Sequence, residues 1–129
     1  MRVHGLAWVG TRTDQAPQMA AFVRDVLGLS PALEQDDFWV LKMADGAKVE
    51  VFGPASPHNR HFADAPVAGF LVDDVFAATD ELLAAGVEVV QEPVLDPYGN
   101  AWVHFRAPDG NLYELTQDPG VHRQGRAST

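Results

Sequence analysis

Two glutamates at matching places in the chain carry side chains suited to chemistry. Glu50 lies in Lys48-Val-Glu-Val-Phe52. Glu114 lies 64 positions later, in Asn111-Leu-Tyr-Glu-Leu115. Two carboxylates can hold a hard divalent ion when water or a substrate completes its shell, and they can also bind a cation or hydrogen-bond donors directly. The sequence therefore predicts a cavity that receives one acidic residue from each half of the chain.

His104 is the candidate general acid or base. Pro108-Asp-Gly110 predicts a tight turn between two strands, and the two-residue period of a strand places Trp102 and His104 on one face. One register that this turn permits sets His104 opposite Glu114, which would orient the imidazole for proton transfer near neutral pH. The alternative is a histidine that only hydrogen-bonds a ligand or a neighbour, and binding is favoured over catalysis.

Aromatic residues accompany these polar candidates. Trp8 and Trp102 are predicted walls of a small-molecule site, because such sites combine aromatic rings with a few polar groups. A ring beside carboxylates would also suit a cationic ligand. For Trp8, burial against a helix is an equal alternative, because the sequence does not fix the phase of the first strand.

Two helices are predicted to position these residues, Pro17–Leu27 and Val75–Ala85. Gly28 and Gly86 follow them as C-terminal stops and lie 58 positions apart. A period near 60 predicts two similar supersecondary units. The apolar faces that recur at helical spacing are Met19, Phe22, Val23, Val26 and Leu27 in the first helix and Val75, Ala78, Leu82 and Ala85 in the second.

Each helix is expected to follow one strand and to precede about three more. The strands read from the sequence are Val3–Arg12, Phe38–Met43, Lys48–Phe52, Val67–Val72, Val87–Gln91, Ala101–Arg106 and Leu112–Thr116. We therefore expect one domain over residues 1–117, with modules at 1–53 and 67–117 and a linker at 54–66. Residues 118–129 contain few apolar side chains and are predicted to be a disordered tail.

Composition narrows the possible functions. The 129 residues contain no cysteine, which excludes disulfides, thiolate metal sites and a cysteine nucleophile. The formal net charge of −9 argues against binding to nucleic acid, because phosphate backbones would be repelled. No segment is long and apolar enough to span a membrane. We expect a cytoplasmic protein.

Three segments resemble the vicinal oxygen chelate superfamily, which includes glyoxalase I, the fosfomycin and bleomycin resistance proteins and the extradiol dioxygenases. They are Phe22-Val-Arg-Asp-Val-Leu-Gly-Leu29, Gly69-Phe-Leu-Val-Asp-Asp-Val75 and Phe105-Arg-Ala-Pro-Asp-Gly-Asn-Leu-Tyr-Glu-Leu115. The resemblance covers residues 3 to about 117. It implies an α+β fold in which two βαβββ modules form a cup-shaped, partly open barrel around a ligand, and a homodimer.

The resemblance also assigns metal-ligand positions. Members of the glyoxalase type take one ligand from the first strand and one from the last strand of each module. Glu50 and Glu114 match the two last-strand positions. The first-strand positions fall at Leu6 or Ala7 and at Val67, where no ligating side chain stands. His4 is the nearest histidine, so the tentative metal ligands are His4, Glu50 and Glu114.

Two functional hypotheses follow. The first is a small-molecule binding protein without a complete metal site or other cofactor, similar to the bleomycin-resistance branch, with a ligand between Trp8, Glu50, Trp102, His104 and Glu114. The second is a lyase or isomerase of the glyoxalase type that uses Glu50 and Glu114 around Mn, Ni, Zn, Co or Mg. Whether the protein is an enzyme stays open between them.

Overall fold

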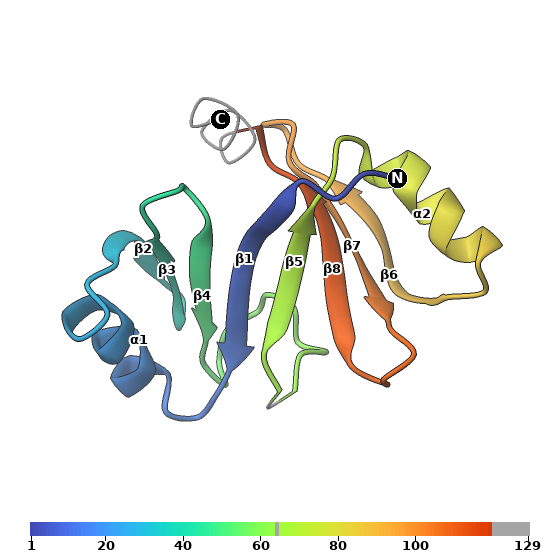
Figure 1. Cartoon of the computed structure of the whole chain (residues 1–129). Helices are drawn as coiled ribbons and strands as arrows, with labels where there is room; N and C mark the ends of the chain where they lie inside the picture. Colours follow the sequence, from blue (N-terminus) through green and yellow to red (C-terminus); the bar gives the residue numbers. More distant parts are fainter. Residues whose placement is uncertain (64, 120–129) are drawn as a thin grey trace. The chain divides into compact units, whose positions relative to one another are not determined.

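The chain folds as two successive βαβββ modules. The computed structural model describes residues 1–63 and 65–119 (Figure 1). Within these residues, the order strand, helix and three strands occurs twice. The α+β class and the two βαβββ modules predicted from the sequence are confirmed. The predicted tail at 118–129 falls almost wholly on residues 120–129, which lie outside the described part.

The first module builds the N-terminal unit, which comprises Trp8–Val67. Its strands follow the order β2-β3-β4-β1, in which β1 runs parallel to β4 and the other neighbours are antiparallel. Helix α1 packs on β3 and β4. The elements are β1 (Gly5–Arg12), α1 (Ala16–Asp25), β2 (Ser30–Gln35), β3 (Phe38–Lys42) and β4 (Lys48–Phe52).

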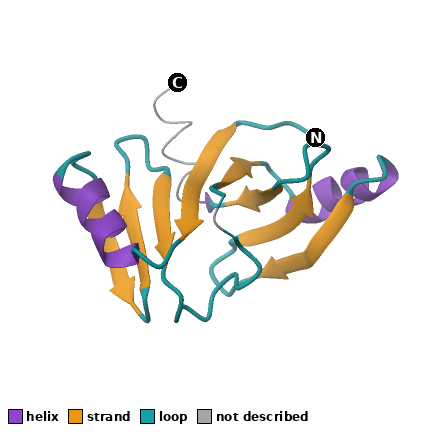
Figure 2. Cartoon of the chain, turned by 90° about the horizontal axis from the view of Figure 1, so that it is seen from below, coloured by secondary structure: helices purple, strands orange, loops and turns teal. Residues whose placement is uncertain are grey.

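The second module builds the C-terminal unit, which comprises residues from Ala68 onward together with Met1–Ala7. Its strands repeat the pattern of the first module in the order β5-β8-β7-β6, with β5 parallel to β8. In each unit the helix lies across one face of its own strands (Figures 1 and 2). The elements are β5 (Val67–Leu71), α2 (Val75–Ala84), β6 (Glu88–Leu95), β7 (Ala101–Arg106) and β8 (Leu112–Gln117).

The buried face of helix α2 is as predicted except at Ala85, which is exposed and follows the last residue of the helix. Val75, Ala78 and Leu82 pack with Val103 of β7 and Leu115 of β8 in one apolar core. The N-cap of the helix is Asp74, whose carboxylate accepts hydrogen bonds from two backbone N–H groups of the first turn. Gly86 follows the helix with a φ of 78°, as a C-terminal stop requires. The core fixes which face of β7 and β8 is turned toward the helix.

The predicted buried face of α1 is wrong in part. The buried residues of this helix are Ala16, Ala20 and Val23. Phe22 is 45% exposed and Val26 is 70% exposed. Small side chains at i, i+4 and i+7 allow the helix to lie close to β3 and β4, so the larger apolar residues beside them are turned outward. The helix also ends at Asp25 rather than Leu27.

Strand β2 was not predicted. All six of its residues are exposed. A strand with no buried face needs no alternation of apolar and polar side chains, which is the pattern that would have revealed it. It pairs with β3 through a two-residue turn in which Asp36 and Asp37 have φ values of 53° and 60°. Two successive residues with positive φ are the mark of a tight hairpin turn, and aspartate tolerates this conformation. The Asp-Asp pair was therefore the available signal.

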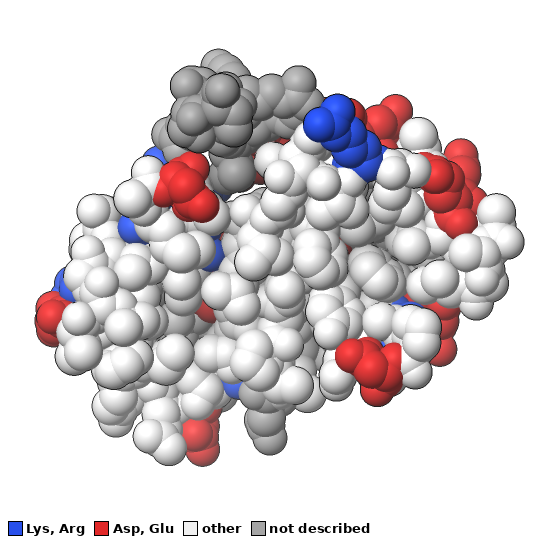
Figure 3. Space-filling model, viewed as in Figure 1, with Lys and Arg blue, Asp and Glu red and all other residues white. Residues whose placement is uncertain are grey.

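Charged side chains are scattered over the surface and do not gather in one patch on the face shown in Figure 3. Figure 3 shows acidic side chains on the visible face with uncharged surface between them.

Among the described residues, no helix has the length and apolar character needed to cross a membrane.

We predict that Asp74→Ala lowers the free energy of unfolding by about 1 kcal/mol, because two N–H groups of α2 lose their acceptor. Urea unfolding would measure the change. Asp80→Ala, in the same helix but exposed, is the matched control and should cause no loss. Equal losses in the two variants would contradict the role of the cap.

Candidate functional site

A buried hydrogen bond joins His104 and Glu114 in the C-terminal unit. The antiparallel register of β7 and β8 sets the two residues directly opposite each other, which is a register that the turn at Pro108-Asp-Gly110 permits. His104 Nε2 lies 2.8 Å from Glu114 Oε1. The imidazole is fully buried and the glutamate is 5% exposed. Both side chains of this hydrogen bond are thus enclosed by protein.

The protonation of His104 follows from its burial. Removal from water lowers the pKa of His104 from its ordinary value of 6.5 to about 4. The imidazole is therefore neutral at pH 7, and its Nε2 forms a hydrogen bond with Oε1 of Glu114.

Trp102 shares a face with this pair. Ala101, Val103 and Leu115 point into the core under α2, so strand alternation puts Trp102, His104 and Glu114 on the opposite face. Gln91 of β6 is the strand partner of His104 on the side away from Glu114. The C-terminal unit thus brings together three of the predicted site residues.

Trp8 and Glu50 share one face of the N-terminal unit. Gly10 separates them, because its register partner on β4 is Glu50. A Cβ at position 10 would lie 2.8 Å from Cζ3 of Trp8 and would overlap the carbonyl oxygen of Glu50. Position 10 must therefore be glycine for the indole to lie along the strand. Trp8 itself is 4% exposed.

The two glutamates have equivalent neighbours. Glu50 lies beside Gly10 in the parallel pair β1–β4, and Glu114 lies beside Gly69 in the parallel pair β5–β8. The residues two positions before these glycines are Trp8 and Val67. Val67 was the expected first-strand ligand position of the second module, so its equivalent in the first module is Trp8 and not Leu6 or Ala7.

His4 interacts with a different carboxylate from those expected. Its Nε2 lies 2.9 Å from Asp73 Oδ1, and its backbone N–H donates to the carbonyl oxygen of Leu71. These contacts hold the N-terminal segment against the end of β5. Within residues 1–63 and 65–119, no group of three or more His, Cys, Asp and Glu side chains is arranged to hold a metal ion.

The sequence did not indicate the roles of Arg12 and Phe62. The ring of Phe62 stacks on Trp8 with centroids 5.9 Å apart. Arg12 donates to backbone carbonyls in the segment that follows β4. Arg12 lies four residues after Trp8 on the same strand face, and this spacing was the available signal. Phe62 lies in a segment without periodicity, so no signal could have found it.

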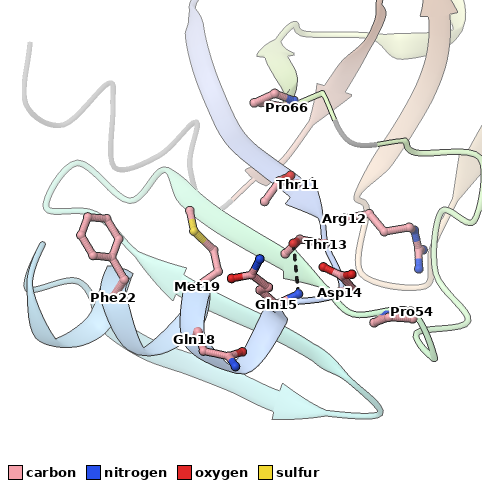
Figure 4. Close-up of a pocket in the computed structure, with 10 residues that line it drawn as sticks. All are labelled: Thr11, Arg12, Thr13, Asp14, Gln15, Gln18, Met19, Phe22, Pro54 and Pro66. Atoms are coloured by element: carbon pink, nitrogen blue, oxygen red, sulfur yellow. Dashed lines mark hydrogen bonds between the residues drawn. The ribbon is translucent and has the colours of Figure 1, made fainter.

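An open hollow also lies in the N-terminal unit, beside α1 (Figure 4). Its volume is about 830 Å³. Residues of β1 and of α1 both line it. The lining residues are Thr11, Arg12, Thr13, Asp14, Gln15, Gln18, Met19, Phe22, Pro54 and Pro66.

Comparison with known proteins covers nearly the whole chain. Residues 5–115 match the family model described as Glyoxalase/Bleomycin resistance protein/Dioxygenase superfamily. No curated protein matches the sequence.

Solved structures share the fold. A Mn(II)-bound glyoxalase from Novosphingobium aromaticivorans is 29% identical, with a TM-score of 0.71, over 91% of this chain and 40% of the other. The chain thus spans less than half the length of that glyoxalase. A superfamily member from Vibrio splendidus 12B01 is 19% identical over 85% and 96% of the two chains, with a TM-score of 0.65. A methylmalonyl-CoA epimerase from Streptomyces coelicolor is 16% identical over 92% and 99%, with a TM-score of 0.65.

Acidification should destabilise the protein through His104. The unfolded imidazole has a pKa near 6.5 and the folded one about 4, so the unfolded chain binds more protons between these values. The stabilising contribution is present above pH 6.5 and is lost as the pH falls toward 4, by on the order of 2 kcal/mol at pH 4.5.

Urea unfolding at pH 7.5 and pH 4.5 would measure this loss. His104→Gln is the comparison, because its amide can still donate to Glu114 but does not titrate. The wild type should lose more stability than the variant. An equal loss in both proteins would show that His104 does not titrate as expected.

Proposed function

The chain belongs to the glyoxalase/bleomycin resistance protein/dioxygenase superfamily, and we propose that it binds a small molecule without a complete metal site. The ligand-binding residues in this proposal are Trp8, Glu50, Trp102, His104 and Glu114. The buried hydrogen bond between His104 and Glu114 carries the proposal. It brings together an imidazole and a carboxyl group, two polar groups that can orient a ligand through hydrogen bonds.

The lowered pKa of His104 favours binding of a ligand over transfer of a proton. A general acid or base works best when its pKa lies near the working pH. The pKa of His104, lowered to about 4 by burial, is far below that range. The imidazole is thus better suited to orienting a ligand than to exchanging a proton with it. A ligand with a cationic or N–H-rich group beside an aromatic ring would match the carboxylates and indoles.

The second candidate is a divalent-metal-dependent lyase or isomerase. The 29% identity with a Mn(II)-bound glyoxalase favours it, and Glu50 and Glu114 would be its carboxylate ligands. The rest of the donor set does not fit a resident metal. Trp8 and Val67 stand at the equivalent first-strand positions, and the imidazole of His4 bonds with Asp73. Binding without metal is therefore our first choice.

Thermal unfolding of chelator-treated protein would separate the two candidates. A ligand that binds only the folded state raises its stability by about 2.7 kcal/mol at a hundredfold excess over Kd. We predict no rise with Mn, Ni, Zn, Co or Mg, and a rise with some members of a panel of aromatic amines and guanidines. Glu114→Gln should abolish the rise, whereas Glu92→Gln, an exposed control on β6, should keep it.

Metal ions would give the opposite result if the second candidate is correct. A rise with one of these metals that is lost in Glu50→Gln and Glu114→Gln would replace the binding proposal by the metal enzyme. A rise with the organic panel that survives Glu114→Gln would show that the ligand binds elsewhere.

We also propose that residues 1–117 act as one domain that assembles as a homodimer in the cytoplasm. Family resemblance supports the dimer, and the lack of cysteine is compatible with a reducing compartment. Light scattering should give twice the mass of a single chain. A mass that stays at one chain over the accessible concentration range would contradict the dimer.

A further inference from the structure

Residues 53–62, which follow β4, form a segment that we call the strap. It contains neither helix nor strand. Two side chains from other parts of the N-terminal unit hold its backbone, one cationic and one anionic. The beginning of the strap is thus held through its own peptide groups.

Arg12, at the end of β1, is the cationic anchor. Its Nη1 donates to the carbonyl oxygen of Gly53 at 2.8 Å and lies 3.5 Å from that of Ser56. Its Nη2 donates to the carbonyl oxygen of His58. The guanidinium also lies over the ring of Phe52, with Cζ 5.6 Å from the ring centroid. The planar guanidinium holds its donors on separate nitrogens in a rigid fork, whereas an ammonium carries all of its donors on one nitrogen.

Asp37, from the β2–β3 turn, is the anionic anchor. Its carboxylate accepts the N–H of Ala55 at 2.9 Å, and its backbone carbonyl accepts the N–H of Gly53 at 2.8 Å. The same carboxylate occupies the space that a side chain at position 53 would need. The two anchors together fix the beginning of the strap against the sheet.

The far end of the strap covers Trp8. Phe62 is buried, stacks on the indole and meets Phe52 edge-on with centroids 5.5 Å apart. Its backbone N–H donates to the carbonyl oxygen of Asn59, which has a φ of 50°. A ligand that touches the ring face of Trp8 under Phe62 can do so only after Phe62 moves.

We propose that the strap is a releasable cover and that Arg12 is its latch, a positioning residue that keeps Phe62 on Trp8. The latch is incomplete, because Nε of Arg12 is buried and has no hydrogen-bond partner among the described residues. When the strap is released, this N–H would regain a hydrogen bond to water, which lowers the free-energy cost of the release. The consequence for ligand access rests on the proposed function, in which Trp8 contacts the ligand.

The role of Arg12 as a latch can be tested without a ligand. A negative result would therefore contradict the latch and not the proposed binding of a small molecule. Trypsin cleaves after Arg60, which lies exposed in the strap. When opening is fast relative to cleavage, the cleavage rate follows the population of the open form. We expect Arg12→Met to raise cleavage after Arg60 by about tenfold, a change that corresponds to about 1.4 kcal/mol.

Internal and external controls separate release of the strap from general unfolding. Cleavage after Lys42 and Lys48, in β3 and β4, should not rise with cleavage after Arg60. Arg24→Met is the matched control, because Arg24 is exposed on α1 and pairs with its neighbour Asp25. An unchanged rate at Arg60, or an equal rise at all three sites, would overturn the latch.

A second measurement reports on Trp8 directly. Trp39→Phe and Trp102→Phe remove the other two indoles, so that Trp8 alone gives the tryptophan fluorescence. Quenching of this fluorescence by acrylamide should increase with Arg12→Met and stay constant with Arg24→Met.

Arg12→Lys is the substitute if Arg12→Met does not fold. It keeps an alkyl side chain and the positive charge but offers only one nitrogen, and it should give intermediate cleavage after Arg60 and intermediate quenching of Trp8. Wild-type values for a folded Arg12→Lys would contradict a latch that needs the guanidinium fork.

Discussion

The hydrogen bond between His104 and Glu114 allows the C-terminal unit to keep two titratable side chains out of water. A buried carboxylate or imidazole is strongly unfavourable unless a partner satisfies it. The neutral imidazole and the carboxylate satisfy each other at 2.8 Å. The contact depends in turn on the register of β7 and β8, which the apolar core beneath α2 holds in place. Packing on one face of the strands thus makes possible the polar pair on the other.

Local rules predicted this half of the structure well. A short turn and strict alternation restrict which residues of a hairpin can face each other, and the register that sets His104 opposite Glu114 was one that the sequence permitted without requiring it. The glycine stop and the apolar face of α2 were equally local. The same reasoning erred on α1, because Phe22 and Val26 have helical spacing but small residues form the buried face. Periodicity shows that a helix is amphipathic, and packing decides which side is buried.

The other parts of the site depend on residues far apart in the sequence. His4 and Asp73 are 69 positions apart, and Arg12 reaches a carbonyl 46 positions away. Trp8 is covered by Phe62, from a segment with no regular structure. No spacing rule connects such residues, because the sheet order and the path of the strap bring them together. The sequence therefore indicated candidate side chains, while their partners required the fold.

The two modules surround their last-strand glutamates differently. In each, a glycine on the first strand lies beside the glutamate on the last strand. On the other side, Glu50 has Val40 as its antiparallel partner, whereas Glu114 has His104. Valine cannot form a hydrogen bond with a carboxyl group, and histidine can. The duplicated backbone therefore supports two different tasks, a hydrogen-bonded polar pair in the C-terminal unit and an aromatic surface beneath a strap in the N-terminal unit.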